Sequence, residues 1–459
     1  MDKDLKIVVI GAGSASFGLE TLTGLLSHQE FKGRTELTLV DTNPTNLKEV
    51  HSLAEKINHK WDSQVKIEAE SDRKKALENS DFVVLSVAVD RENTWIKDHE
   101  LALKYGIWHY AENGGPGSFS HTARGLSFIM PILYDIHDLA PGAWLLNYTN
   151  PVPRIGYAAE HAGVKSVGLC HQIWHAYAIT GRYLAKDMGV TEPHLLNYEW
   201  AWSDSAIENM VTLSDRAYER YKIIAAGLNH FIWVMDVRRR GSSEDLYPLV
   251  RAERENVNAN FEPLTQHMFK VFGWLPGPGD THLAEYIPYT ATEANWRKYN
   301  IQLYDFEWAR ARRDEMWAQI RGINSGTQPL ILEPNTHERA DWIIKEIFFD
   351  ESAYEHSVNI VNNGSITNLP DDAIVEVPAL VGATGLSGQK VGRMPEAIAS
   401  LLNREVTVAK LITKASIEGD RTAAVQAFAL DPMVNDLRKA ELMVEDYIAV
   451  HKKYLPQFD

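Results

Sequence analysis

The chain is poor in cysteine, with one such residue among 459. A single cysteine excludes a disulfide within the chain, so we expect a reducing compartment, the cytoplasm. No apolar run reaches the roughly 18 residues that a membrane span requires, and no secretory signal precedes the first apolar strand. Acidic residues outnumber basic ones, which gives a formal net charge of −16. That charge argues against nucleic acid and anionic membrane surfaces as partners.

What is present is the composition of a soluble globular protein, with 45% hydrophobic residues. The length exceeds that of one ordinary core, so we expect two packed domains. Strand and helix patterns alternate up to about residue 190, and the rhythm then changes. We therefore predict an α/β fold, with a Rossmann-like doubly wound sheet over residues 1–190 and a mixed α+β domain over 191–459.

The first predicted strand, residues 6–10, runs directly into a glycine turn. Gly11 permits a tight turn, and Gly13 lets the backbone approach a pyrophosphate at the N-terminus of the following helix. A second apolar strand ends at Asp41, whose carboxylate can bind the ribose 2′-hydroxyl of NAD and would repel the 2′-phosphate of NADP. This order predicts an NAD site; the alternative is a tight βα turn in another doubly wound fold.

Further strands are predicted over residues 81–87, 143–147 and 166–170, with a helix over 119–139. Open α/β sheets bind ligands at the carboxyl ends of their strands. Asn147 and Asn150 lie at one such end, where two amides can bind the hydroxyls of a ligand. The alternative is an Asn-Pro turn that starts the next helix.

The lone cysteine, Cys170, lies at another strand end and is followed by His171. Three interpretations compete: Cys170 is a metal ligand as its thiolate, a nucleophile activated by histidine, or an inert side chain. His171 and His175 would share one helical face, a spacing that suits a zinc pair.

Two later segments also carry reactive groups. Residues 221–226 and 231–237 read as two strands around a turn that holds His230, which gains a functional interpretation only if it converges on Cys170. A Pro- and Gly-rich loop over 277–288 presents an acid, a histidine, a second acid and a tyrosine, namely Asp280, His282, Glu285 and Tyr286. The alternative for Asp280 is the N-cap of a helix that begins there.

In this order the segments closely resemble glycoside hydrolase family 4, the NAD- and metal-dependent glycosidases, over essentially the whole chain. The segments that carry the resemblance are 11–14, 147–151, 170–171, 227–230, 375–381 and 429–432. In the mechanism that the resemblance implies, NAD takes hydride from C3 of the sugar and the ketone acidifies the proton on C2. A base removes that proton, and the aglycone leaves C1 by elimination. Water then adds, the hydride returns, and NAD is recycled, while a metal on the C2 and C3 oxygens stabilises the enolate.

Carried over to this chain, the resemblance implies that Cys170 and His230 bind a divalent metal. It also implies that the domain over 191–459 serves substrate binding, metal binding and oligomerisation. The family typically uses Mn²⁺, although a thiolate would prefer a softer metal. Asn150 resembles a substrate-binding amide. His171 occupies a position that varies with substrate and serves the leaving oxygen, and histidine there looks like the subgroup that acts on unphosphorylated sugars.

For the base at C2, the resemblance suggests Tyr286, whose pKa near 10 would have to fall beside a metal charge. Asp280 is the alternative base or acid partner. Ser14 belongs to the family's N-terminal glycine segment, and Glu112 is expected to line the nicotinamide pocket.

The sequence therefore predicts an enzyme that hydrolyses a small-molecule glycoside, α-linked and unphosphorylated, with galactose, glucose or a uronic acid as the glycone. The resemblance suggests a homodimer or homotetramer. Two alternatives stay open: an NAD-dependent sugar dehydrogenase or keto-reductase of similar fold, which would accumulate NADH, and an NAD-sensing regulatory protein without turnover.

Overall fold

The computed structural model of the protein describes residues 4–331 and 339–459, apart from the side chains of residues 16–20. Within these residues the strands form one sheet of twelve, in the order β3-β2-β1-β4-β5-β6-β10-β11-β7-β8-β9, with β12 beside β11. The strands are β1 Leu5–Ile10, β2 Thr35–Val40, β3 Lys66–Glu70, β4 Phe82–Leu85, β5 Trp144–Asn147, β6 Lys165–Gly168, β7 Tyr221–Leu228, β8 Phe231–Arg239, β9 Leu275–Pro276, β10 Ala353–Val361, β11 Ile374–Gly382 and β12 Gly385–Gly388.

The first six strands pair in parallel, as the predicted doubly wound sheet requires. The central strand β1 is almost wholly buried because helices cover both faces, which explains its uninterrupted apolar run. The α/β class is thus confirmed. The one parallel strand that the sequence analysis did not predict is β3, an exposed edge strand whose residues alternate in polarity.

The remaining strands extend the same sheet with antiparallel pairs. Strand β10 joins β6 through the pair Asn359 and Gly168, and β7 with β8 forms the predicted hairpin. The sheet therefore continues across the boundary predicted at residue 190, and that division into domains stays a prediction.

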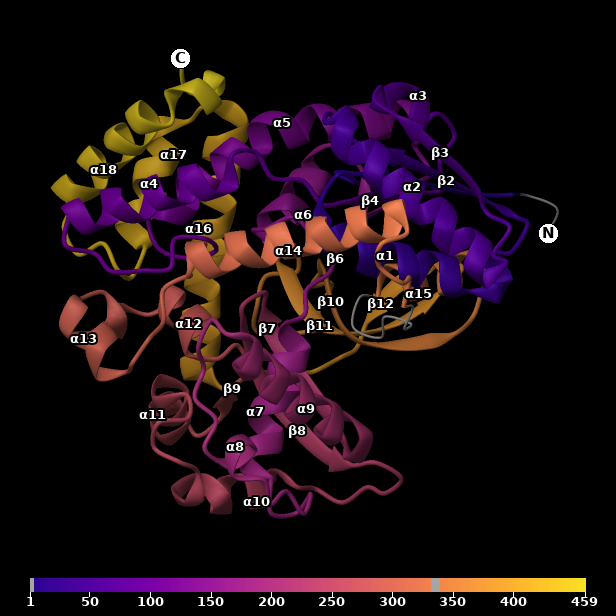
Figure 1. The fold of residues 1–459 in the computed structure, drawn as a ribbon. Coiled ribbons are helices and arrows are strands. Elements are labelled where there is room, and N and C mark those ends of the chain that lie inside the picture. Colours follow the sequence, from indigo (N-terminus) through magenta and orange to yellow (C-terminus); the bar gives the residue numbers. More distant parts are fainter. Residues whose placement is uncertain (1–3, 332–338) are drawn as a thin grey trace.

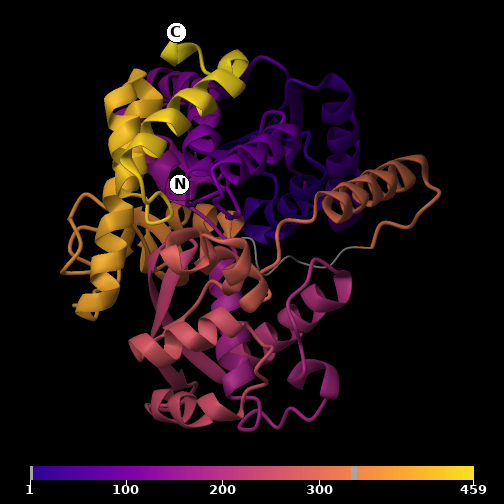
Figure 2. The same ribbon diagram turned by 90° about the vertical axis from the view of Figure 1, so that its left-hand side faces the viewer.

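Helices cover both faces of the sheet and build two further regions (Figure 1). A lower region is formed by α7 to α11 beside β7, β8 and β9, and an upper one by the C-terminal helices α16 to α18 beside α4 and α5. Figure 2 shows the long helix α14 at the edge of the molecule, where it packs on α1 and α2. The helices are α1 Ala15–Ser27, α2 Pro44–Trp61, α3 Arg73–Leu77, α4 Arg91–Lys104, α5 Gly117–Leu139, α6 Val152–His161, α7 Gln172–Tyr183, α8 Pro193–Leu196, α9 Asp204–Arg220, α10 Tyr247–Ala252, α11 Pro263–Phe272, α12 Asp280–Leu283, α13 Glu293–Lys298, α14 Phe306–Ser325, α15 Ala340–Phe348, α16 Glu396–Glu418, α17 Arg421–Leu430 and α18 Leu437–Val450.

None of the helices in the described part of the chain is both long enough and apolar enough to cross a lipid bilayer.

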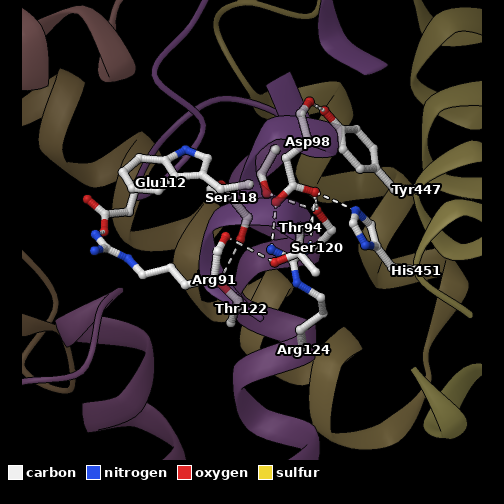
Figure 3. Close-up of polar contacts among 12 residues, drawn as sticks. Arg91, Thr94, Asp98, Glu112, Ser118, Ser120, Thr122, Arg124, Tyr447 and His451 are labelled. Carbon is white, nitrogen blue, oxygen red and sulfur yellow. Dashed lines mark hydrogen bonds and ion pairs between the residues drawn. The ribbon is translucent and has the colours of Figure 1, made fainter. Parts of the chain in front are cut away.

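A buried ionic cluster ties the C-terminal helices to α4 and α5 (Figure 3). The Asp98 carboxylate accepts two hydrogen bonds from the Arg124 guanidinium, at 3.0 and 2.6 Å, and lies 2.7 Å from Nε2 of His451. Tyr447 donates to the backbone carbonyl of Asp98 at 3.0 Å. The C-terminal segment therefore helps to fix Arg124, which lines the cavity described next.

Candidate active site

The glycine turn after β1 allows neighbouring groups to lie very close to its backbone. Gly11 has a φ of +89°, and a Cβ there would lie 1.9 Å from the carbonyl oxygen of Ser86. The N–H of Gly13 donates to Oδ2 of Asp41 at 2.8 Å, and a Cβ on Gly13 would lie 2.7 Å from that carboxylate. Only glycine fits at these two positions, so the turn and the acid at the end of β2 form one unit.

A cavity of about 820 Å³ runs along the carboxyl ends of the parallel strands. We call it the cofactor cavity. It is lined by all five residues expected to bind cofactor, together with the expected substrate amide: Gly11, Gly13, Ser14, Asp41, Glu112 and Asn150. The cradle that a Cβ on Gly13 would fill, beside an acid at the end of the second strand, fits a dinucleotide.

Glu112 anchors the inner end of the cofactor cavity. Its Oε1 accepts hydrogen bonds from Arg91 at 2.9 Å and from the Asn150 amide at 3.2 Å. Burial alone would raise the pKa of Glu112, but the Arg91 guanidinium and nearby histidines lower it to about 2. Glu112 is therefore an anion at neutral pH that holds Asn150 in place.

The structure brings Cys170 and His230 together. Cys170 follows β6, His230 lies in the turn between β7 and β8, and Sγ of Cys170 is 3.3 Å from Nε2 of His230. Burial, together with Glu376, raises the pKa of the Cys170 thiol to about 12, which disfavours a free nucleophilic thiolate. A soft sulfur beside an imidazole fits a divalent metal, whose charge would stabilise the thiolate.

One residue links this pair to the cofactor cavity. The Asn113 side-chain amide lies 2.7 Å from Nδ1 of His230 and 3.3 Å from Oε2 of Glu112. The candidate metal ligands and the inner end of the cofactor cavity are thus neighbours across a single side chain.

Two residues of the Pro- and Gly-rich loop to which the sequence assigned no role, His282 and Glu285, complete the cluster. Donor atoms of His230, His282 and Glu285 all lie within 4.8 Å of one another. Oε2 of the buried Glu285 accepts the backbone N–H groups of residues 112, 113 and 114, at 3.1, 2.7 and 3.0 Å. Its Oε1 lies 3.1 Å from Nδ1 of His282. The available signal was the reactive loop itself, in which a histidine on α12 stands three residues before an acid on the 3-10 helix Ala284–Tyr286.

Tyr286 lies beside this cluster but faces another way. Its hydroxyl donates to the backbone carbonyl of Asn229 at 3.2 Å, and its ring stacks on Phe231. It lines a separate cavity of about 30 Å³. Burial and the neighbouring Glu285 raise the pKa of Tyr286 well above 10.

Asp280 is not the N-cap of the helix that begins with it; the N-cap of α12 is Gly279. The Asp280 carboxylate instead accepts the N–H groups of Leu264 and Thr265, at 2.8 and 2.7 Å. It thereby caps α11, because the first N–H groups of that helix lack intrahelical partners. This use turns the carboxylate toward α11.

His171 and Cys170 together line a cavity of about 220 Å³, which we call the second cavity. His175 belongs to a different group of contacts, since its Nε2 lies 3.7 Å from Glu262. The structure thus associates Cys170 with His230, and His175 with Glu262.

Comparison with known families decides the class of protein. The model of the family 4 glycosyl hydrolases matches residues 6–184, and the model of the family's C-terminal domain matches residues 225–434. The chain belongs to this family.

Relatives of this family 4 enzyme align over the full length. It is 29% identical to an alpha-glucosidase of Erwinia rhapontici over 98% of both chains, and 26% identical to an alpha-galactosidase of Bacillus subtilis over 99% of both. A crystal structure of a 6-phospho-alpha-glucosidase from gut microorganisms, in complex with NAD and Mn²⁺, covers 100% of both chains at 20% identity, with a TM-score of 0.77. The predicted resemblance is confirmed. Membership makes the protein a glycoside hydrolase that depends on NAD and a divalent metal.

Proposed function

We propose that this enzyme hydrolyses an unphosphorylated α-glycoside through reversible oxidation at C3 of the sugar. The observation that carries the proposal is the bridge formed by Asn113, which sets the Cys170 and His230 pair beside the inner end of the cofactor cavity. A hydride acceptor and a metal would there reach adjacent carbons of one sugar ring. The names of the alpha-glucosidase and alpha-galactosidase relatives support the α linkage.

The bound groups supply chemistry that protein side chains lack: NAD accepts and returns a hydride, and a divalent cation, Mn²⁺ in our proposal, polarises sugar oxygens. Gly11, Gly13 and Asp41 would hold the first, and Cys170 and His230 the second. Asn150, held by Glu112, is placed to bind a sugar hydroxyl.

We assign the base at C2 to His282. Its Nδ1 lies against the Glu285 carboxylate, so Nδ1 carries the hydrogen and the lone pair of Nε2 is left to accept the C2 proton. A role as a third metal ligand fits less well. Two imidazoles share an ion when their in-plane lone pairs converge, whereas the His230 and His282 rings lie face to face, 4.1 Å apart with a tilt of 32°.

We assign protonation of the leaving oxygen to His171. It follows Cys170 directly and lines the second cavity, on the side of the candidate metal pair away from Asn113. A base at His282 and an acid at His171 would then act from different elements, the short helix α12 and the start of α7.

The mechanism is tested by hydrolysis in deuterated water, with product analysed by NMR. We expect deuterium at C2 of the released sugar, because a proton on an imidazole exchanges with solvent before it returns. NADH should not accumulate. Product without deuterium would contradict elimination, and one NADH formed per sugar would identify a dehydrogenase.

The base is tested by comparing His282→Gln with Tyr286→Phe. His282→Gln should lower kcat about 100-fold to 10,000-fold, the range of a lost general base, with metal content unchanged. Tyr286→Phe keeps the stacked ring and should retain most of the activity. The reverse pattern would return the role to Tyr286, and loss of metal from His282→Gln would make His282 a ligand.

A further inference from the structure

The second cavity is a defined chamber beyond the candidate metal pair. Cys170 and His171 form part of its wall, and other parts come from α7, α9, β10 and the start of α15. Tyr148 lines both this cavity and the cofactor cavity. A ligand bound between NAD and Cys170 could therefore extend into this chamber past His171.

The charges in the chamber are unfavourable for an anion. Among the described residues, Arg339 is the one arginine that lines the chamber. Its Nε donates to Oε2 of Glu355 at 2.9 Å, and a terminal nitrogen of the guanidinium donates to Oε1 of the same carboxylate. A neighbouring acid, Glu346, lies 3.9 Å from the guanidinium, but burial and the nearby Glu355 raise the pKa of Glu346 to about 8, so it adds no full charge at neutral pH. The charge of Arg339 is thus balanced by Glu355, and the remaining charged residue among those described in the wall, Asp215, is an acid. Burial and nearby arginines lower the pKa of His356, another wall residue, to about 4, so it is neutral.

Aromatic side chains supply the apolar part of the wall. Trp174, Tyr218 and Trp342 line the chamber. The ring of Trp342 is fixed on one side by the Arg339 guanidinium, 5.1 Å from its centroid, and on another by an edge contact with His28 at 4.8 Å. Rigid aromatic faces beside carboxylates that accept hydrogen bonds suit a ring that carries hydroxyls and no negative charge.

We propose that the second cavity is the binding site for the leaving group, and that it selects uncharged aglycones, such as a neutral sugar, over anionic ones. The proposal rests on the proposed function, because it uses His171 at the leaving oxygen. It adds the chemical class of the aglycone that is bonded to that oxygen.

The test uses three substrates with the same α-linked glycone: the methyl glycoside, the 4-carboxamidophenyl glycoside and the 4-carboxyphenyl glycoside. The two aryl groups have nearly the same size, and only the second carries a negative charge. The wild type should hydrolyse the amide with a kcat/KM at least about tenfold above that of the carboxylate. In Glu355→Gln, which leaves Arg339 less fully compensated, this preference should fall at least about fivefold, while the methyl glycoside changes less than about twofold.

A second variant keeps the proposal testable if Glu355→Gln does not fold. Asp215 lies on α9, is exposed and lines the chamber, so Asp215→Asn should lower the preference in the same direction by a smaller factor. Asp204→Asn is the matched control, because Asp204 lies on the same helix and has a well-exposed side chain outside the chamber. It should leave the preference for the amide over the carboxylate unchanged. An unchanged preference in both chamber variants, with normal methyl glycoside turnover, would overturn the proposal.

A binding measurement separates this proposal from the proposed function. Isothermal titration calorimetry with the free phenols 4-hydroxybenzamide and 4-hydroxybenzoate needs no turnover. The amide should bind the wild type more tightly, and Glu355→Gln should reduce the difference. Equal binding of both phenols would overturn the charge selection even in an active enzyme. Lack of turnover on all three glycosides would refute the proposed function instead.

Discussion

The parallel and antiparallel halves of the sheet contribute to the site in different ways. In the parallel half three candidate residues follow the ends of their own strands: Gly11 after β1, Asp41 after β2 and Cys170 after β6, whereas Glu112 lies between α4 and α5. In the antiparallel half His230 lies in a hairpin turn, and His282 with Glu285 lies on short helical segments. The first half positions its groups by strand order, which any doubly wound sheet provides. The second positions them by hydrogen bonds between segments that are distant in the sequence.

Glu285 shows how such a contact works. Its carboxylate accepts backbone N–H groups from a segment more than 170 residues earlier in the chain. The same carboxylate holds Nδ1 of His282. One buried acid therefore sets the loop that carries Glu112 and Asn113 and orients the proposed base. In our proposal the parallel half holds the cofactor and carries the acid His171, and the antiparallel half supplies the base His282.

The largest effect is expected where the halves meet. Cys170→Ser should remove the bound metal and lower activity about 1,000-fold or more, since a metal contributes several kcal/mol to the stabilisation of developing charge. Elemental analysis and kcat measure the two losses, and the thermal midpoint, expected to change little, is the control. Full metal content in the folded variant would show that Cys170 is not a ligand and that the halves do not share the metal.

A second prediction concerns the ionic cluster in which Asp98 of α4 contacts Arg124 of α5 and His451 at the end of α18. Asp98→Asn would leave Arg124 buried without its counter-charge, and should lower the free energy of unfolding by about 3–5 kcal/mol at pH 7. Burial alone would raise the pKa of Asp98, but Arg124 and His451 lower it below its ordinary value. The ion pair therefore stabilises the fold above the unfolded pKa of about 3.9, and this contribution is lost as the pH falls through the lower folded pKa.

Denaturant unfolding of both proteins across a pH series measures this effect. The difference between wild type and Asp98→Asn should be full near pH 7 and shrink in strong acid. Asp446→Asn is a suitable control, because Asp446 lies on the same C-terminal helix but pairs with Lys104 at the surface. A difference independent of pH would mean that the carboxylate charge contributes nothing to stability.

The parallel and antiparallel halves of the sheet also differ in how much of each could be predicted from the sequence. The parallel strands were predicted within about two residues, because buried apolar runs such as residues 6–10 have few alternative structures. The polar edge strand β3 carries no such run and was missed. Cys170 was a prominent candidate because it is the chain's lone thiol at a strand end. His282 and Glu285 were assigned no role, since the contacts of Glu285 are with backbone groups distant in sequence. The N-cap alternative for Asp280 was wrong, because that carboxylate caps α11 instead.

The smallest expected effect tests whether the parallel half alone sets cofactor choice. The Asp41 carboxylate accepts the N–H groups of Gly13 and Asn43, at 2.8 and 2.7 Å, and a carboxylate has further lone pairs for a ribose hydroxyl. A hydrogen bond to a charged group contributes about 1.5–3 kcal/mol, so Asp41→Ala should weaken NAD binding about tenfold to 100-fold. NADP should be weakened less, because its 2′-phosphate no longer faces an anion. Calorimetric titration with both cofactors measures the ratio of the NADP and NAD dissociation constants.

Asp72→Asn is the control, because Asp72 lines the same cavity and caps α3, a role that asparagine can also fill. This variant should leave the ratio of the two dissociation constants unaltered. If the wild type already binds NAD and NADP equally, cofactor choice does not depend on the end of β2.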